Sequence, residues 1–241
     1  MPSFLYHFFH NETNDRTERG LVAIPKDTNK WPEAWKKIDY KRYFLHKPIE
    51  LPRTDSILFT RFLGRRKSSG RRILKNKINF ATVSRMLQCG YGLRDGHGEN
   101  RTVPSAGKRY PLELYLALFE DIEGCRSGIY HYAPQRHVLE PVTYDGFSRE
   151  EIRSLVAQKW LADAQGMIVI SSVFGRTTDK YGSRGYRYIL IEAGHVAQNI
   201  LLSAADDQIS ALPVAGANEE EIERKIGLNT SNERVVYTLF F

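Results

Sequence analysis

The spacing of apolar residues changes repeatedly between residue 57 and residue 241. Apolar positions at helical spacing predict helices over 56–66, 79–92, 148–161, 184–207 and 218–228. Apolar runs predict strands over 112–119, 128–134, 137–142, 166–174 and 233–241, and a strand or loop over 209–216. Because strands and helices alternate, we expect one α+β domain over 57–241, with a mixed β-sheet flanked by helices.

The helix expected over 184–207 is apolar on most of its circumference. A surface helix usually keeps one polar face, so this pattern is typical of a buried helix. His195 lies within it, but "EAGHVAQN" lacks the second histidine of a zinc-binding helix. We therefore interpret His195 as a packing or subunit-contact residue.

Residues 1–56 are expected to form an N-terminal extension that is aromatic and basic. Pro32, Pro48 and Pro52 favour short helical pieces joined by extended chain. Four aromatic residues of the extension are expected to pack on the main body: Trp31, Trp35, Tyr40 and Tyr43.

Charge is distributed unevenly over the 241 residues, whose formal net charge is +7. Residues 26–77 contain sixteen basic and five acidic residues, so this segment carries +11 and the remainder −4. Such asymmetry suggests an anionic partner, namely nucleic acid, an acidic peptide or a phosphate-bearing cofactor. A solvated basic face is the alternative. Nucleic acid is not expected, because base-stacking platforms and repeated basic motifs are missing from the sequence.

Compartment and membrane signals are weak. No apolar run approaches the roughly 20 residues that span a bilayer, and the chain starts without a basic leader or a small-residue cleavage site. Cys89 and Cys125 make neither a metal-binding pair nor a disulfide framework. We expect a cytoplasmic protein with no membrane partner and no metal.

Two segments have the composition of anion or cofactor sites. The basic loop "GRRKSSGRR" at 64–72 places hydroxyl and guanidinium groups together, which suits a phosphate monoester. A basic linker is the alternative. The turn "PSAG" at 104–107 consists of small residues, so its backbone can approach a flat ligand closely. Lys108, directly after it, can balance negative charge on a reduced flavin. A plain tight turn is the alternative.

Two further segments are candidates for catalysis and ring contact. An ammonium group beside a phenol favours the phenolate, so Lys180-Tyr181 could supply a general base. A surface pair is the alternative. The segment 212–217 combines a proline with small residues and could cover one face of a planar ring, although a helix entry loop has the same composition. Phosphate-loop, nucleophile-elbow and dinucleotide motifs are missing from the sequence.

In this order and at this spacing, the segments resemble the flavin-dependent nitroreductase superfamily. They look like its SagB-type dehydrogenase branch, the azoline oxidases of peptide natural-product pathways. The resemblance covers roughly 57–241 and rests on "RTVPSAGKRYPLELYLAL", "GIYHYAPQRHVLEPV", "KYGSRGYRYILIEAGHVAQNILLSA" and "ALPVAGANEEEIERKIGL". The extension also resembles that branch. The resemblance implies a homodimer with FMN at its interface and the helix at 185–205 central to that interface.

The resemblance also implies residue roles. The FMN phosphate and ring would meet the basic loop through Arg66, Lys67, Ser69 and Arg71. The flavin would lie along Pro104, Ser105, Ala106 and Gly107, with Lys108 at its pyrimidine edge, and against Leu212, Pro213, Val214, Ala215 and Gly216. Lys180 and Tyr181 match the catalytic pair of the branch. The usual arginine pair is shifted here, and "PSAGKRYP" carries Lys-Arg where the branch more often has small or apolar residues.

The implied activity is FMN-dependent oxidation of thiazoline or oxazoline rings to azoles in a peptide. Tyr181, assisted by Lys180, would remove the ring proton while a hydride passes to the flavin. From its charge alone, the basic segment 26–77 is expected to dock an acidic leader peptide or a cyclodehydratase partner. An assembly-line partner of the enzyme is the alternative. The alternatives are an NAD(P)H-dependent reductase of nitro compounds or quinones, and a flavin-free scaffold subunit of a modification complex.

Overall fold

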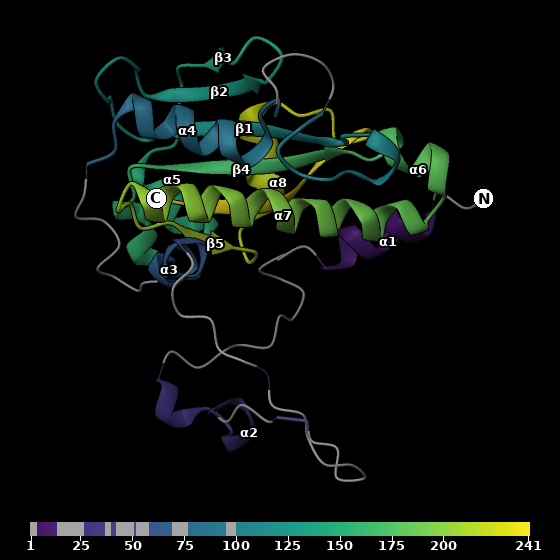
Figure 1. Ribbon diagram of the computed structural model, residues 1–241, viewed down its shortest axis with the longest axis horizontal. Helices are drawn as coiled ribbons and strands as arrows, with labels where there is room; N and C mark the ends of the chain where they lie inside the picture. Colours follow the sequence, from purple (N-terminus) through teal and green to yellow (C-terminus); the bar gives the residue numbers. More distant parts are fainter. Residues whose placement is uncertain are drawn as a thin grey trace.

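A six-stranded antiparallel sheet forms the centre of the molecule (Figure 1). The computed structural model describes residues 4–13, 27–36, 40, 41, 51, 58–68, 77–94 and 100–241. The strands are β1 Leu112–Leu118, β2 Gly128–Ala133, β3 Val138–Thr143, β4 Gly166–Val173, β5 Leu212–Val214 and β6 Glu233–Phe240. Their order is β3-β2-β1-β4-β6-β5, and each described pair is antiparallel. The expected strands and the α+β class are confirmed. The expected mixed sheet is wrong, because all the described strand pairs are antiparallel.

Helices cover both faces of the sheet. They are α1 Phe4–Thr13, α2 Glu33–Lys36, α3 Leu58–Arg65, α4 Phe80–Tyr91, α5 Arg149–Leu155, α6 Gly175–Tyr181, α7 Arg184–Asp206 and α8 Glu219–Ile226. α4 and α7 pack together over one face, and α5 and α8 lie over the other (Figure 1). The apolar pattern predicted five of these helices but neither α1 nor α6. The sequence of α6, "GRTTDKY", is polar and therefore carries no helical period.

Each face of the sheet has its own apolar core. Leu112, Leu114 and Leu116 of β1 face α4 and α7, whereas Tyr115 and Ala117 face α5 and α8. Burial on both faces explains why the central strands are apolar in nearly every position.

Local capping sets several helix ends where the sequence predicted them. Asn79 begins α4, since its side chain accepts a hydrogen bond from the Thr82 N–H at 2.9 Å. Ser148 and Glu151 form a capping box at the start of α5. The helix expected to continue to residue 161 ends at Leu155, because the next residue, Val156, leaves the helix to form a β-bridge with Ala217.

The N-terminal extension contacts the main body through α1. The Tyr6 hydroxyl lies 3.5 Å from the Thr178 hydroxyl, and His10 Nδ1 lies 3.1 Å from the Tyr186 hydroxyl. The expected packing of Trp35 and Tyr40 is not found, since these side chains are 47% and 77% exposed. Trp35 instead packs edge-on against Trp31, one helical turn away. Tyr43 lies outside the described residues.

The long helix α7 buries one face in the chain and leaves the other open. Ile189, Val196 and Ile200 are fully buried, while Leu190 and Ile191 are 39% and 51% exposed. Within one chain, therefore, only one side of the apolar surface of α7 is buried. Of the described helices, none has the length and hydropathy needed to cross a membrane.

Candidate functional site

The small-residue turn and the lysine-tyrosine pair lie against each other, although they are far apart in the sequence. The turn precedes β1 and α6 follows β4, and strand pairing sets Leu112 opposite Ser172. The start of β1 therefore meets the end of β4, which brings the turn to α6. A Cβ atom added to Gly107 would lie 2.8 Å from the Lys180 Nζ and closer still to the Tyr181 hydroxyl.

The backbone of the turn is unusual. Gly107 has φ 60° and ψ 24°, and the non-glycine residues Lys108 and Tyr110 have φ of 53° and 45°. Positive φ is uncommon for residues with a Cβ atom and persists only where surrounding contacts impose it. One such contact is the hydrogen bond from the Tyr110 N–H to the Ser105 Oγ, at 2.9 Å. Glycine at residue 107 adopts the positive φ without strain, and the space that Lys180 and Tyr181 occupy leaves no room for a Cβ atom there.

A buried carboxylate supports the turn. Glu192 of α7 is 3% exposed, accepts a hydrogen bond from the Tyr91 hydroxyl at 2.9 Å and is hydrogen-bonded to Ser105. Burial raises the pKa of Glu192, and the bonds to Ser105 and Tyr91 and the charge of Arg101 oppose that rise. Because the Ser105 hydroxyl is engaged within the protein, the turn presents mainly its backbone to a ligand.

Arg176 links α6 to the turn in both directions. Its guanidinium donates to the Tyr110 carbonyl at 3.3 Å, and its own carbonyl accepts from the Arg109 Nε at 2.6 Å. The same guanidinium pairs with Glu113 of β1 at 2.5 Å. Since Arg176 lies one helical turn before Lys180, these contacts hold the pair in place relative to the turn.

The network continues across the sheet through a histidine between two carboxylates. His131 Nε2 lies 3.0 Å from Glu113, and its Nδ1 lies 2.9 Å from Glu140, which also pairs with Arg136. The hydrogen bond with Glu113, aided by Glu140, raises the pKa of His131. Protonated His131 completes an alternating series of charges from Arg136 to Arg176.

The basic loop lies at the other end of α7. A cavity of about 590 Å³ is lined by Gly64, Arg65, Arg66, Lys67, Leu201, Ala205, Gln208, Ile209, Ser210 and Ala211. Arg66 donates to Ser68 at 3.2 Å, and Arg65 pairs with Asp206 at 3.3 Å. Among the described residues of the lining, three are cations and none is a carboxylate, although Asp206 next to the lining pairs with Arg65. Arg66 and Lys67 therefore suit an anion such as a phosphate.

The segment 212–216 adjoins this cavity, because β5 begins directly after its lining residue Ala211. Pro213 pairs with Leu239 of β6, and Ala215 and Gly216 are exposed. Arg66 and Lys67 are thus brought near the predicted ring-covering segment. Ser69 and Arg71, also predicted to meet FMN, lie outside the described residues.

Within one chain, the predicted site residues therefore form two groups. The first comprises Pro104–Lys108 with Lys180 and Tyr181, and we name it the turn end of α7. The second comprises Arg66, Lys67 and 212–216, and we name it the basic end. α7 has 23 residues and rises about 34 Å, a distance that no mononucleotide spans.

Two positioning residues, Glu192 and Arg176, were not predicted from the sequence. Glu192 left a signal, since it is an acidic residue inside an otherwise apolar helix whose burial requires a partner. The sequence gives no such signal for Arg176, because "GRTTDKY" has no apolar residues at helical spacing and the partners of Arg176 lie on other segments.

Comparison with known proteins gives the family. The family model described as the nitroreductase family matches residues 63–241. The chain belongs to the nitroreductase family. A Methanocaldococcus jannaschii protein named as a nitroreductase, MJ1384, is 34% identical over 174 residues, which are 72% of this nitroreductase and 86% of the relative.

Other similar proteins process peptides. The microcin B17-processing protein McbC of Escherichia coli is 29% identical over 172 residues, which are 69% of this chain. This nitroreductase spans only 63% of the length of that relative. In structure, a chain of the E. coli microcin synthetase McbBCD complex with truncated pro-MccB17 bound matches with a TM-score of 0.80 at 24% identity. That match covers 100% of this chain and 91% of the other, and it shows the shared fold.

These findings support the resemblance to the SagB-type branch within the family. Nitroreductases are generally oxidoreductases, and members of the family typically bind FMN.

Proposed function

We propose that this nitroreductase is an FMN-dependent dehydrogenase that oxidises thiazoline or oxazoline rings of a peptide to azoles. The approach of Gly107 to Lys180 and Tyr181 carries the proposal, because it joins a turn shaped for a flat ligand to a candidate base. The similarity to a microcin-processing protein supports a peptide as the substrate.

The donor groups of the basic end fit the phosphate of FMN. Arg66 and Lys67 line this cavity, and the nearby Asp206 carboxylate is paired with Arg65, so a phosphate there would gain charge-assisted hydrogen bonds from Arg66 and Lys67. At the turn end, the backbone of 104–107 would lie along the isoalloxazine ring, with Lys108 at its pyrimidine edge. The segment 212–216 would cover the ring from the other chain. FMN, when bound there, supplies the two-electron acceptor that the oxidation requires.

A homodimer would complete this site. If α7 helices of two copies ran antiparallel across a two-fold axis, each basic end would meet the turn end of the partner. The open face of α7 suits such an interface, since Leu190 and Ile191 are exposed and the space beside Gly194 is free for 4 Å. We infer that each active site draws on both chains.

The residues of the turn end would perform the proton transfer. Tyr181 would remove the proton from the ring carbon, and the Lys180 Nζ lies 5.4 Å from the centre of the Tyr181 ring. A positive charge at that position stabilises negative charge on the phenol oxygen. Tyr188 packs edge-on against the Tyr181 ring at 5.3 Å and restricts its motion.

The decisive experiment uses the purified protein, loaded with FMN, and a synthetic peptide containing one thiazoline. Mass spectrometry should show the loss of two hydrogen atoms as the azole forms. Lys180→Ala and Tyr181→Phe should retain FMN but lose turnover. Full turnover in both variants would refute the assigned base, and a protein that takes up no FMN would instead favour the scaffold function.

Mixed dimers test the shared site. Lys180→Ala/Tyr181→Phe and Arg66→Ala/Lys67→Ala chains are each expected to be inactive alone. Random reassortment makes half of the dimers heterodimers with one intact site, so the mixture should regain about a quarter of the wild-type turnover. Absence of recovery in proven heterodimers would place each site within a single chain.

A reductase that uses NAD(P)H on nitro compounds or quinones is the second candidate, favoured by the 34% identity to MJ1384. Rapid bleaching of bound FMN by NADPH, with an inert thiazoline peptide, would select it. The match to a chain of a microcin synthetase complex supports a cyclodehydratase partner for the azoline oxidase. Co-elution of the two proteins in size-exclusion chromatography tests that partner.

A further inference from the structure

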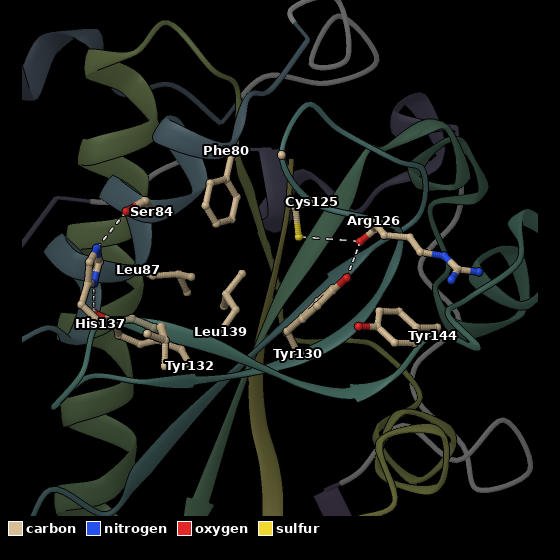
Figure 2. Close-up of a pocket in the computed structure, with 12 residues that line it drawn as sticks. Phe80, Ser84, Leu87, Cys125, Arg126, Tyr130, Tyr132, His137, Leu139 and Tyr144 are labelled. Carbon is tan, nitrogen blue, oxygen red and sulfur yellow. Dashed lines mark hydrogen bonds between the residues drawn. The ribbon is translucent and has the colours of Figure 1, made fainter.

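A second cavity lies on the sheet far from the proposed FMN site. It has a volume of about 700 Å³ and opens between α4, the β2–β3 hairpin and the 122–126 turn (Figure 2). Its walls consist of Phe80, Ser84, Leu87, Gly124, Cys125, Arg126, Tyr130, Tyr132, His137, Val138, Leu139 and Tyr144. We name it the hairpin cavity. The volume falls within the range of small-molecule sites in proteins.

The polar groups around the hairpin cavity bond to one another. The Tyr130 hydroxyl donates to the Arg126 carbonyl at 2.6 Å. The Tyr132 hydroxyl lies 2.8 Å from His137 Nδ1, and His137 Nε2 lies 2.8 Å from the Ser84 hydroxyl. Figure 2 shows these bonds along the sides of the hollow, with Phe80, Leu139 and Tyr130 around its middle. The cavity therefore offers aromatic and aliphatic surface rather than open hydrogen-bonding groups.

One residue of the wall has a conformation that needs explanation. His137 in the β2–β3 turn has φ 51°, which is uncommon for a residue with a Cβ atom. Its two hydrogen bonds hold the imidazole across the end of the cavity nearest Ser84. Histidine is among the residue types enriched in this region of φ, so the conformation fits the turn that joins β2 to β3. Its role here is to place the imidazole at the cavity wall.

At the end of the cavity opposite His137, Arg126 supplies a positive charge. Arg126 lies over the Tyr144 ring, with its guanidinium carbon 5.0 Å from the ring centre. Among the described residues that line the cavity, none is a carboxylate. A guanidinium group stacked on a ring still presents its N–H edges to an anion. An anionic substituent at this rim would meet the Arg126 guanidinium. The Asp121 carboxylate also interacts with Arg126 and with Cys125, but it accepts a hydrogen bond from the Ser127 N–H at 2.7 Å and lies outside the described lining.

The hairpin cavity is distinct from the turn end of α7. Phe80 begins α4 beside the cavity, and Tyr91 ends α4 beside Glu192. The helix rises about 16 Å between these two residues. A ligand in the hairpin cavity would therefore leave the turn and the lysine-tyrosine pair open.

We propose that the hairpin cavity is a binding site for a planar aromatic or heteroaromatic carboxylate. The ring system would pack between Phe80, Tyr130 and Leu139, where edge and face contacts with aromatic side chains are favourable. The carboxylate would lie at the rim beside Arg126. The site is separate from the proposed FMN site, and its test does not depend on catalysis.

Cys125 in the wall provides a direct reporter. Iodoacetamide alkylates both free cysteines, and mass spectrometry separates Cys125 from Cys89, which lies outside the cavity lining. Burial raises the pKa of the Cys125 thiol, so the reaction is followed at pH 9. 2-Naphthoate serves as the probe. At about ten times its dissociation constant, it should slow alkylation of Cys125 about tenfold and leave Cys89 unchanged.

Two variants locate the probe. Val138→Trp should fill the cavity and abolish the protection of Cys125. Val142→Trp is the matched control, since Val142 lies on the same strand with similar exposure but outside the lining. Protection should persist in this control.

A third variant tests the charge. Arg126→Gln should weaken binding of 2-naphthoate about fivefold, the effect of an exposed ion pair, and leave binding of neutral 2-naphthamide unchanged. The proposal is overturned if 2-naphthoate leaves Cys125 unprotected, protects Cys89 equally, or protects Val138→Trp as well as the native protein. Equal loss of both probes in Arg126→Gln would overturn the carboxylate assignment.

Discussion

The two ends of α7 are built differently. At the turn end, Gly107, Ser105 and Arg109 are each held by a contact to α6 or α7, and a buried carboxylate lies beneath them. At the basic end, Arg65 and Lys67 are exposed around an open cavity. The turn end is organised by the fold before any ligand arrives, whereas the basic end offers charge and space.

The difference follows from the chemistry that each end is proposed to perform. A base must be held within a fraction of an ångström of its substrate, which requires packed neighbours and second-layer hydrogen bonds. A phosphate is recognised by charge at short range, and flexible cations tolerate small displacements. Substitutions at the turn end should therefore disturb both function and stability, and those at the basic end mainly affinity.

The largest effect is expected from Gly107→Ala. The new methyl group would overlap the Tyr181 hydroxyl and crowd Lys180, so turnover should fall about 100-fold as the pair is displaced. Gly227→Ala is the matched control, because Gly227 also has positive φ but no atom within 4 Å of its Cβ position. The control should lose about 1 kcal/mol of stability and no turnover. Equal losses of turnover in both would mean that backbone strain, not contact, matters at residue 107.

The next largest effect is expected at Glu192, where the replacing residue decides whether the free energy of unfolding falls or rises. Glu192→Ala would leave the Tyr91 hydroxyl and Ser105 without their partner, at about 2–3 kcal/mol of unfolding free energy. Glu192→Gln keeps an acceptor and is neutral. Because burial raises the pKa of Glu192, its stabilising contribution is present below the unfolded value of 4.5 and is lost as pH rises through the folded value.

This prediction is tested by measuring the free energy of unfolding in urea at two pH values. Glu192→Gln should be at least as stable as the native protein at pH 8, and its relative gain should be smaller at pH 4. A variant that is less stable at pH 8 than at pH 4, relative to native protein, would show that the carboxylate is needed in its charged form.

Acid should weaken the docking of α1, which contacts α6 and α7 at the turn end. Burial is the main cause that lowers the pKa of His10 to about 4 from 6.5, with Arg234 adding to it. The unfolded state binds the proton first as pH falls below 6.5, so docking of α1 loses about 2 kcal/mol between pH 7 and pH 5. Hydrogen exchange of the α1 amides, corrected for the pH dependence of the chemical rate, should accelerate accordingly. His10→Gln should flatten this dependence, whereas His195→Gln on the open face of α7 should not.

The smallest effect on stability is expected at the basic end. Arg66→Ala/Lys67→Ala should change the unfolding free energy by less than about 0.5 kcal/mol, because both groups are at the surface. The same change removes two charge-assisted contacts, so it should raise the FMN dissociation constant about 100-fold or more and leave the chain without FMN at concentrations that saturate the native protein. It should also weaken the dependence of FMN binding on salt. Arg153→Ala, an exposed arginine elsewhere, is the control for net charge. A stability loss as large as that of Glu192→Ala would erase the distinction between the two ends.

The sequence alone determined the parts of this protein that depend on local chemistry. Asn79 and Ser148 predicted helix starts correctly because a cap needs only its next three residues. The central strands were predicted because burial on both faces demands apolar residues along them. The chemical types at the candidate site, from "PSAG" to Lys180-Tyr181, were also visible in the sequence.

Only the tertiary structure decided which of these residues meet. The register of β1 against β4 placed Gly107 beside Lys180 and Tyr181, and no local pattern encodes that register. Arg176 and Glu192 gained their roles from partners on other segments, so a scan of neighbouring residues could not assign them. The length of α7 then separated the basic end from the turn end, because a rigid helix sets a distance that the sequence order of the two segments does not reveal.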